Sequence, residues 1–468
     1  MIDNWQDAFI DLAYVIAAIF FIVGLKLLSS PASARRGNQL SAIGMAIAIL
    51  ATLFTPGLDH VVLILVAMVI GAAVSVYPAR TVKMTAMPQM VAIFNGMGGA
   101  TAALVSVAEF QHKVNVPRGE GLSIVLGTII GAISFTGSMI AFAKLQELLS
   151  GRPIVFPSQK IINAALFAAI LLLAIGVLGL QDGNGARFLL VLIFVASLAL
   201  GATLVLPIGG ADMPVVIAIL NSLTGLAAAL TGFVLSNQVL VIAGALVGAS
   251  GSLLTLMMAR AMNRSVANVL FGAFGAVKPG ASASSAAGGE ALPVREISPD
   301  DAAVPLAYAQ RVIIVPGYGL AVAQAQHTVR ELADVLQERG VDVRYAIHPV
   351  AGRMPGHMNV LLAEANVPYD DLYEMEQIND DFSKTDVALV IGANDVTNPA
   401  ARNDPSSPIY GMPILNVDQA ENVIVLKRSM KSGFAGIENE LFHNPKTTML
   451  FGDAKDSIAR LIAAVKAA

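Results

Sequence analysis

Two cations and a hydroxyl follow one short apolar run in the last third of the chain. Lys427, Arg428 and Ser429 come directly after Val423 to Leu426, which we expect to form a buried strand. An Arg side chain holds a phosphate with two parallel hydrogen bonds, and a Lys side chain adds a point charge. The group therefore suits a nucleotide 2'-phosphate, although a Lys–Arg pair at a solvated strand end is also common.

A turn with two glycines follows an earlier apolar run, Val312 to Val315. Residues 317–319 read Gly-Tyr-Gly and open a helical pattern, the context in which a pyrophosphate can approach a helix N-terminus. The third fingerprint position is Val322, and His348 stands where an NAD-binding sheet carries an acidic residue. A lone Gly-x-Gly is weak, but with the two cations in one sheet it favours NADP.

Two further loops follow expected strands. Residues 348–357 are glycine-rich and contain one Arg, and residues 392–395 read Gly-Ala-Asn-Asp. Each is also compatible with an ordinary turn, but parallel strands end at one edge of a sheet, where ligands bind. His348 and His357 are interpreted as ordinary loop histidines, because hydride transfer needs no acid or base.

Strands and helices alternate around these loops. A helical pattern runs from Leu320 to Glu338 and is closed by Gly340. The alternation predicts an α/β Rossmann-like domain with a parallel doubly wound sheet at residues 308–468. Residues 271–307, with a Pro/Gly/Ser/Ala-rich stretch from Lys278 to Leu292, are expected to be a flexible linker. The expected strands are Val312 to Val315, Val343 to Ile347, Val387 to Ile391, Ile414 to Leu415, Val423 to Leu426 and Met449 to Phe451.

The first 270 residues are too apolar for a soluble domain. The whole chain is 56% hydrophobic and only 13% charged, with a mean hydropathy of +0.70. A polytopic α-helical membrane bundle is therefore predicted for residues 1–270, with about nine spans, or eight if the short second run does not cross. The absence of cysteine excludes disulfides and thiolate metal sites. The apolar runs are Phe9 to Leu28, Ser41 to Phe54, Val61 to Tyr77, Pro88 to Ala108, Leu122 to Lys144, Ile161 to Leu180, Phe188 to Pro207, Met213 to Leu235 and Val239 to Met258.

Basic residues gather in one alternating set of loops, which should be cytoplasmic. This places the N-terminus outside and everything after residue 260 inside, and it requires an odd number of spans. Nine spans therefore fit better than eight. The two sets are Lys26, Arg35, Arg36, Arg80, Lys83, Lys144, Arg152, Lys160, Arg260 and Arg264 on one side, and Lys113, Arg118 and Arg187 on the other.

Polar residues inside the spans are candidates for function, because each is costly in hydrocarbon without a partner. No Asp, Glu, Lys or His lies clearly at the centre of a span. Asp212 begins the eighth span, where it is also explained as a helix N-cap before Pro214. For Asn95 and Asn221 the simpler explanation is an interhelical hydrogen bond. The polar span residues are Asn95, Ser138, Asn163, Asn221, Ser222 and Ser250.

Taken together, the chain resembles the β subunit of the proton-translocating NAD(P) transhydrogenases. The resemblance covers nearly the whole chain apart from the linker. It is carried by long and unusual strings at residues 209–216 (GGADMPVV), 261–265 (AMNRS), 316–319 (PGYG), 348–364, 391–395, 427–430 and 451–455.

The resemblance implies an enzyme of the Si-specific class that passes hydride between NADH and NADP+ while protons cross the membrane toward the cytoplasm. NADP(H) would bind this chain, and NAD(H) would bind a partner alpha subunit that adds further membrane helices. The enzyme would be a dimer of alpha–beta units in the inner membrane of a bacterium. It would involve neither a metal nor nucleic acid, and this chain alone would transfer no hydride.

The family's nucleotide contacts carry over onto the loops already described. Residues 431–436 resemble a lid over the nucleotide, which Gly433 and Gly436 would make mobile. The implied contacts are Gly317, Tyr318, Gly319, Leu320, Ala321, Val322, Val350, Ala351, Gly352, Arg353, Met354, Pro355, Gly392, Ala393, Asn394, Asp395, Lys427, Arg428, Ser429, Met430, Lys431, Ser432, Gly433, Phe434, Asp453 and Ala454.

In the membrane part, the resemblance gives Ser138, Asp212 and Asn221 a role in proton translocation or coupling. Some members carry a histidine where this chain has Asn95. An amide exchanges no proton at ordinary pH, so Asn95 would organise water and a partner helix would supply the protonatable group.

Two other functions fit a membrane bundle joined to a nucleotide fold. One is a channel or transporter gated by a cytoplasmic nucleotide-sensing domain, although the sequence has no TVGYG-like filter. The other is a membrane-anchored dehydrogenase, which would need its own hydride acceptor site, and only one nucleotide fold is predicted.

Overall fold

The computed structural model describes residues 3–113, 116–151, 153–180, 183–209, 212–271, 294–354, 356–407, 409–433 and 435–468. The chain forms two compact units, each described by itself below. The first comprises Met1–Ile208 with Val215–Thr255, and the second comprises Gly209–Pro214 with Leu256–Ala468. Most of the stretch expected as a linker lies outside the described residues.

Long helices build the first unit. Among the described residues, eight helices are long and apolar enough to span a membrane, which confirms the polytopic bundle. A ninth long helix, α2, is not among them, because Arg35 and Arg36 interrupt its first turns. The helices are α1 (Asp3–Leu27), α2 (Pro31–Leu53), α3 (Val61–Thr81), α4 (Met87–His112), α5 (Arg118–Leu145), α6 (Gln159–Leu180), α7 (Gly183–Val205), α8 (Met213–Val234) and α9 (Gln238–Ala261), with a short 3-10 turn, η1 (Met84–Ala86).

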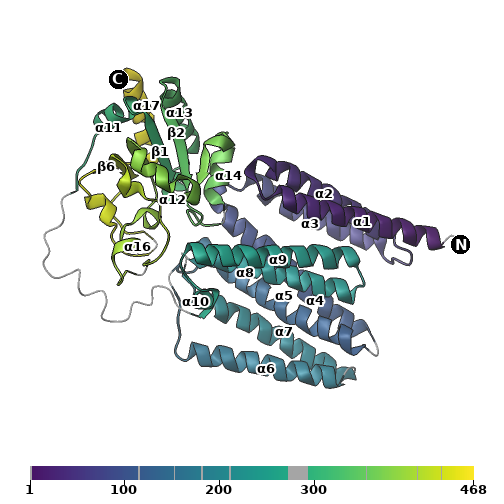
Figure 1. Ribbon diagram of the computed structural model, residues 1–468. Helices are drawn as coiled ribbons and strands as arrows, with labels where there is room; N and C mark the ends of the chain where they lie inside the picture. The colour runs from purple at the N-terminus through teal and green to yellow at the C-terminus, as the bar shows by residue number, and fades with distance from the viewer. Residues whose placement is uncertain are drawn as a thin grey trace. The chain divides into compact units, whose positions relative to one another are not determined.

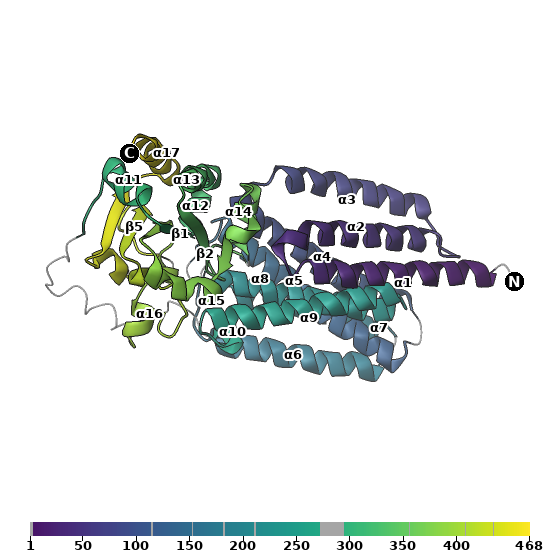
Figure 2. The same cartoon turned by 45° about the horizontal axis from the view of Figure 1, so that its top comes forward.

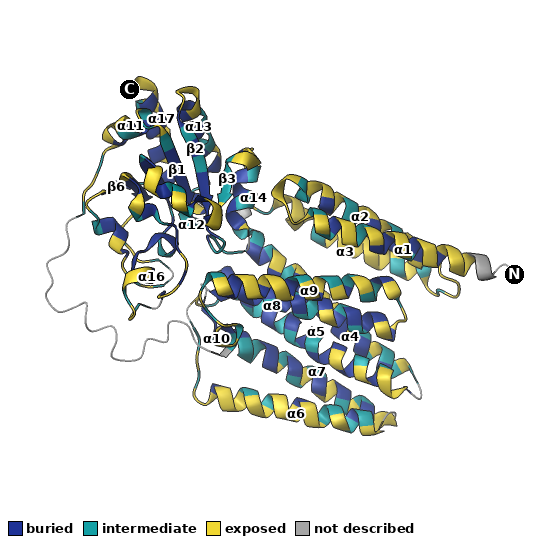
Figure 3. Cartoon of the chain, viewed as in Figure 1, coloured by how far each residue is buried: buried dark blue, intermediate teal, exposed yellow. Residues whose placement is uncertain are grey.

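Small residues allow these helices to approach closely. A Cβ on Gly131 of α5 would lie 2.6 Å from the carbonyl oxygen of Gly99 on α4, so the two backbones meet without side chains between them. Helices α1 and α2 lie side by side, as do α6 and α7 (Figures 1 and 2). Figure 3 shows the outward faces exposed, and α3 has no buried residue. Apolar exposed faces are what a lipid-facing bundle requires.

The second unit is built on one parallel sheet, which confirms the predicted α/β fold. Its strand order is β3-β2-β1-β4-β5-β6, and every neighbouring pair is parallel. This is the strand order of a dinucleotide-binding sheet. From β1 the chain adds strands first toward one edge of the sheet (β2, β3) and then, from β4 on, toward the other edge (β5, β6). The strands are β1 (Arg311–Pro316), β2 (Asp342–Ile347), β3 (Leu372–Glu374), β4 (Val387–Ile391), β5 (Asn422–Lys427) and β6 (Thr447–Phe451).

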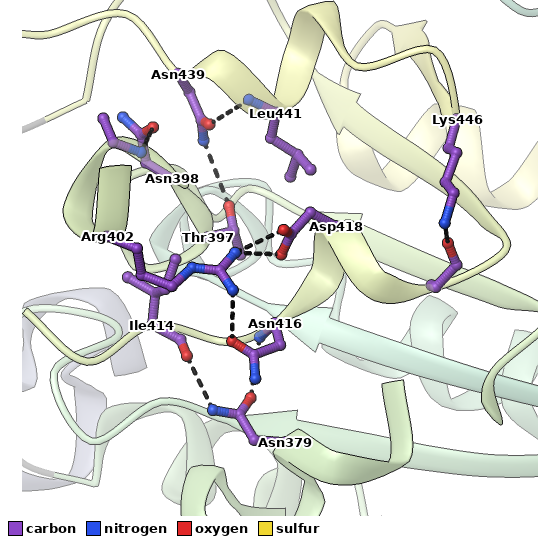
Figure 4. Close-up of polar contacts among 12 residues, drawn as sticks. Asn379, Thr397, Asn398, Arg402, Ile414, Asn416, Asp418, Asn439, Leu441 and Lys446 are labelled. Carbon is purple, nitrogen blue, oxygen red and sulfur yellow. Dashed lines mark hydrogen bonds and ion pairs between the residues drawn. The ribbon is translucent and has the colours of Figure 1, made fainter. Parts of the chain in front are cut away.

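The strand expected at Ile414 to Leu415 is wrong. The side-chain amide of Asn379 donates to the carbonyl of Ile414 at 3.0 Å and accepts from the backbone nitrogen of Asn416 at 2.9 Å (Figure 4). The Leu415 nitrogen donates to Val396. A side chain and a loop therefore satisfy the backbone groups that a neighbouring strand would otherwise pair with.

Helices cover both faces of the sheet. Helices α11, α13 and α17 pack together, while η4, η6 and η7 contribute Phe382, Val417 and Phe442 to the core beneath the other face. The helix expected from Leu320 to Glu338 is split into α12 and α13, because Gln324 between them has a φ of 51°. The helices are α10 (Val266–Phe271), α11 (Pro299–Ala307), α12 (Tyr318–Val322), α13 (Gln326–Glu338), α14 (His357–Glu364), α15 (Met375–Ile378), α16 (Ala400–Asn403) and α17 (Ala454–Ala467), with the 3-10 turns η3 (Tyr369–Asp371), η4 (Asn379–Lys384), η5 (Asp395–Thr397), η6 (Val417–Gln419) and η7 (Glu440–His443).

Candidate functional site

The loops after β1 and β4 cross between these two neighbouring strands, at the point where the strand order reverses. The Gly319 nitrogen donates to the Gly392 carbonyl at 3.0 Å, and a Cβ on Gly319 would lie 2.7 Å from the Cα of Gly392. Gly392 itself has a φ of +66°, which L side chains rarely adopt. Only glycines allow the two loops to cross this closely beside the N-terminus of α12.

A cavity of about 760 Å³ opens at this crossing. It is formed by the loops after β1, β2, β4, β5 and β6, so the structure brings together the five segments that the sequence singled out. The predicted site residues that line it are Gly317, Tyr318, Gly319, Val322, Val350, Ala351, Gly352, Gly392, Ala393, Asn394, Asp395, Lys427, Arg428, Ser429, Lys431, Ser432, Gly433, Asp453 and Ala454.

Five predicted site residues do not line the cavity. Leu320 and Ala321 are buried inside the sheet-facing side of α12. Arg353, Met354 and Met430 are half-buried beside it. Pro355 and Phe434 lie outside the described residues. The guanidinium of Arg353 stacks 4.4 Å above the centre of the Tyr318 ring, so a lining residue and its neighbour are held together by a cation–π contact.

Lys427 turns from the end of β5 toward the segment that follows it. Its ammonium donates to the Lys431 carbonyl at 2.6 Å and lies 4.6 Å from the centre of the Phe442 ring. Burial lowers the pKa of Lys427, and the carboxylates of Asp395 and Glu438 oppose that shift. Arg428 and Ser429 are exposed beside it. The two cations therefore both line the cavity, Lys427 partly buried and Arg428 exposed to solvent.

In the lid segment, residues 431–436, the described residues Gly433 and Ala435 lie against the loop after β4. The Ala435 nitrogen donates to the Asp395 carboxylate at 2.9 Å. A Cβ on Gly433 would lie 2.6 Å from both Asn394 Nδ2 and Asp395 Oδ1. The lid segment thus packs on two residues that line the cavity, and it does so without a side chain at position 433.

The two histidines after β2 are buried and hold the loop in place. His348 donates from Nε2 to the Pro413 carbonyl at 2.8 Å and accepts from the Val350 nitrogen at Nδ1. Burial lowers the pKa of His348 to about 4. The Nδ1 atom of His357 accepts from the Arg353 nitrogen at 3.0 Å. His348 is therefore neutral at ordinary pH and serves the shape of the loop.

The Asp453 carboxylate caps α17. It accepts hydrogen bonds from the backbone nitrogens of Lys455 and Asp456, as an N-cap residue does. Asp453 and the buried Ala454 therefore bring the first turn of a 14-residue helix to the edge of the cavity.

Sequence reasoning missed the apolar wall of the cavity. Ile409 and Met412 line it from the segment after α16, and Val396 lines it from η5. None of them follows a strand or belongs to a motif, so no local signal could have identified them. Ala323, Leu426, Ala435 and Gly452 also line the cavity, each next to a predicted residue.

In the first unit, three helices share a polar cluster. Asn95 on α4 donates from Nδ2 to Ser138 on α5 at 2.9 Å. Ser134, one turn from Ser138, donates to the Leu220 carbonyl at 2.9 Å and lies 2.6 Å from the Thr224 hydroxyl on α8. Ser134 and Thr224 were missed, although the four-residue spacing from Ser138 places Ser134 on the same helix face.

Asn221 and Asp212 lie outside this cluster. Asn221 is half-buried on α8. Asp212 belongs to the second unit and is fully buried, with Arg264 Nη1 3.4 Å from its carboxylate. The structure pairs Asp212 with a cation that the sequence had identified only as a basic loop residue.

Comparison with known proteins identifies the family to which this chain belongs. Residues 10–464 match the family model described as NAD(P) transhydrogenase beta subunit. Two curated proteins of Rhodospirillum rubrum, both named NAD(P) transhydrogenase subunit beta, are 51% identical over 461 residues, which cover 97% of this chain and 98% of theirs. The six-stranded parallel sheet and the membrane helices agree with that match. This chain therefore belongs to the family of NAD(P) transhydrogenase beta subunits.

Proposed function

We propose that this chain binds NADP(H) in the cavity at the carboxyl edge of its sheet and exchanges hydride with NAD(H) held by a partner alpha subunit. Hydride transfer, of the Si-specific class, would be coupled to proton translocation across the membrane. The family's name supports the reaction, since a beta subunit of a transhydrogenase needs a second subunit for the other nucleotide.

One observation carries the choice of NADP(H). Lys427 and Arg428, at the end of β5, line the same cavity as the glycine crossing of Gly319 and Gly392. The crossing brings glycines without side chains to the cavity wall, where a pyrophosphate can approach the backbone closely, and the two cations suit a 2'-phosphate. A volume of about 760 Å³ lies within the range of cofactor pockets. The residues present thus fit the nucleotide.

The residues around the cavity bind and orient; none of them has to move a proton. NADP(H), when bound, supplies the hydride donor or acceptor. His348 is held by two hydrogen bonds, and the Asp395 carboxylate is engaged by Ala435 of the lid segment. The lid segment would exclude water from the nicotinamide while hydride passes between nucleotides.

For the membrane part, Asn95, Ser138, Asp212 and Asn221 are proposed to serve the proton path or its coupling. The Asn95 amide cannot carry a proton, so a helix of the partner subunit would supply the titrating group. We keep the division into a membrane domain at 1–270, a linker at 271–307 and a nucleotide domain at 308–468. Helix α11, which packs on α17, would belong with the last. With α2 counted as a ninth crossing, the N-terminus would lie outside the bacterial inner membrane, and the nucleotide domain in the cytoplasm. The assembly would be a dimer of alpha–beta units.

Titration of the full chain with NADP(H) and NAD(H) tests the nucleotide choice. We expect tighter binding of NADP(H), and a loss of that preference in the double variant Lys427→Ala/Arg428→Ala. The matched control is Lys384→Ala/Arg460→Ala, which removes the same charges from exposed positions away from the cavity. Equal affinity of the wild type for both nucleotides would contradict the proposal.

Sealed membranes that contain this chain with an alpha partner test the reaction. We expect NADH to reduce an NADP+ analogue and protons to move in the same vesicles. Nucleotide-dependent ion flux without hydride transfer would instead indicate a gated channel.

A further inference from the structure

We propose that Asn398 and Asn439 are positioning residues that fasten the C-terminal end of the lid segment to the loop after β4, and thereby set how fast NADP(H) is released. The inference rests on the proposed function, because it concerns the same cavity. Neither residue lines the cavity, and neither belongs to a motif that the sequence identified.

Asn439 reaches from the end of the lid segment into the loop that begins η5. Its Nδ2 atom donates to the Asn394 carbonyl at 2.9 Å and contacts Asn394 Oδ1 at 3.2 Å and Thr397 Oγ1 at 3.4 Å. Its Oδ1 atom accepts from the Leu441 nitrogen at 2.9 Å (Figure 4). Only 1% of Asn439 is exposed. The buried Asn439 side chain thus uses both its amide nitrogen and its amide oxygen, and the nitrogen contacts Asn394, which lines the cavity.

Asn398 makes the reciprocal connection. It is fully buried, and its Nδ2 atom donates to the Glu438 carbonyl at 3.0 Å. Its Oδ1 atom accepts from the Ala400 nitrogen at 3.1 Å and from the Glu440 nitrogen at 3.4 Å. Asn439 therefore bonds to the backbone of residues 394–400, and Asn398 bonds to the backbone of residues 438–441. The two segments are joined by both side chains.

The remaining attachments of the lid segment are of a different kind. At the start of the lid segment, the Lys427 ammonium donates a hydrogen bond to the Lys431 carbonyl. Further along the segment, the Ala435 nitrogen donates to the Asp395 carboxylate. Both use groups that line the cavity. The two asparagines are buried behind it. Opening of the lid segment can therefore release Lys431 and Ala435 while residues 438–441 stay fixed, which makes the asparagine pair the pivot.

A loosened pivot would favour the open state. A lid that spends more time open releases its ligand faster, while the rate of entry changes little. Replacement of Asn439 by Asp turns the Nδ2 donor into an acceptor that faces the Asn394 carbonyl, and loss of a partner in a buried hydrogen bond corresponds to about a tenfold change in an equilibrium.

The experiment follows the fluorescence of NADPH bound to the full chain, in detergent or nanodiscs, after a chase with excess NADP+. We expect Asn439→Asp and Asn398→Asp to raise the release rate about tenfold, with association rates within about twofold of the wild type. The matched control is Asn444→Asp. Asn444 accepts from the Lys446 nitrogen through Oδ1, and an Asp can still do so. Asn439→Ala removes the Nδ2 donor without adding charge and replaces Asn439→Asp if that variant does not fold.

The readout separates positioning from general stability. A purely structural role would lower the fluorescence amplitude, which reports the folded fraction, and leave the release rate constant unchanged. That result, or release rates equal to those of Asn444→Asp, would overturn the inference while NADP(H) binding stands. A wild-type chain that does not bind NADPH would overturn the proposed function and this inference with it.

Discussion

The backbone nitrogen of Gly319 lies 3.0 Å from the carbonyl oxygen of Gly392, and this hydrogen bond joins the loops after β1 and β4 where the sheet reverses direction. The contact is between backbones, with no side chain between the two loops. It brings the N-terminus of α12 and the Asn394–Asp395 turn to the wall of one cavity.

A methyl group at position 319 should separate the two loops. In Gly319→Ala the new Cβ would lie 2.7 Å from the Cα of Gly392, and backbone at that distance must shift. We expect NADP(H) affinity to fall by about tenfold or more, since overpacking of this kind costs about 1–3 kcal/mol. Titration of the full chain measures it. Gly119→Ala is the control, because nothing lies within 4 Å of the added Cβ. Equal affinities in the two variants would show that the crossing does not shape the site.

Most of the sheet could be predicted because a parallel strand covered on both faces reads as an apolar run. The runs at Val387–Ile391 and Val423–Leu426 are of this kind, and both are buried strand residues. The strand β3 could not be found in the same way, because Leu372–Glu374 is three residues long and none of them is buried. The strand expected at residues 414–415 failed because the side chain of Asn379 took the place of a strand partner.

The cavity loops were predictable for a topological reason, and the groups behind them were not. Carboxyl ends of parallel strands share an edge, so the loops after β1, β4 and β5 had to meet. Asn398 and Asn439 act through hydrogen bonds across about 40 positions of sequence, which no local pattern reports. Lys144 was interpreted as a basic loop residue, yet it is buried.

His348 should make the stability of the nucleotide domain depend on pH. Burial lowers the pKa of His348 to about 4 from an ordinary value of 6.5. A histidine held neutral contributes stability that is present above pH 6.5 and is lost as the pH falls toward 4, and the difference amounts to roughly 3 kcal/mol. We expect the thermal midpoint of the wild type to decrease as the pH is lowered from about 7 to about 5.

His348→Gln tests this assignment. Gln can still donate to the Pro413 carbonyl but does not titrate, so the fall in the midpoint should shrink. His327→Gln, at an exposed position of α13, should behave as the wild type does. A full pH dependence in His348→Gln would assign the effect to other groups.

The lid segment should tolerate no side chain at Gly433. A Cβ there would lie 2.6 Å from Asn394 Nδ2 and Asp395 Oδ1, so Gly433→Ala should push the segment away from the loop after β4 and weaken the bond from Ala435 to Asp395. We expect faster NADPH release, by about five- to tenfold, which matches the loss of one hydrogen bond. Stopped-flow fluorescence measures it. Gly436→Ala is a poor control because of its φ of +72°. Gly119→Ala, a matched change with nothing within 4 Å of the added Cβ, is preferable. Release as slow in Gly433→Ala as in Gly119→Ala would contradict the prediction.

Lys144 should stabilise the first unit from inside. Its ammonium donates to the carbonyl of Leu206 and to that of Ile208 at 2.7 Å, just past the end of α7, where helix carbonyls lack partners. Lys144→Met keeps the apolar stem but leaves the Ile208 carbonyl without this donor, while the Leu206 carbonyl still accepts from the Ile154 nitrogen at 3.1 Å. Hydrogen bonds to charged groups contribute about 1.5–3 kcal/mol. We therefore expect a lower thermal midpoint for the detergent-solubilised chain. Lys144→Arg retains a donor, so its thermal midpoint should fall less. Lys160→Met, at an exposed position of α6, should have the thermal midpoint of the wild type. If Lys144→Met were as stable as Lys160→Met, water would have to satisfy the Ile208 carbonyl, and the end of α7 would not depend on this lysine.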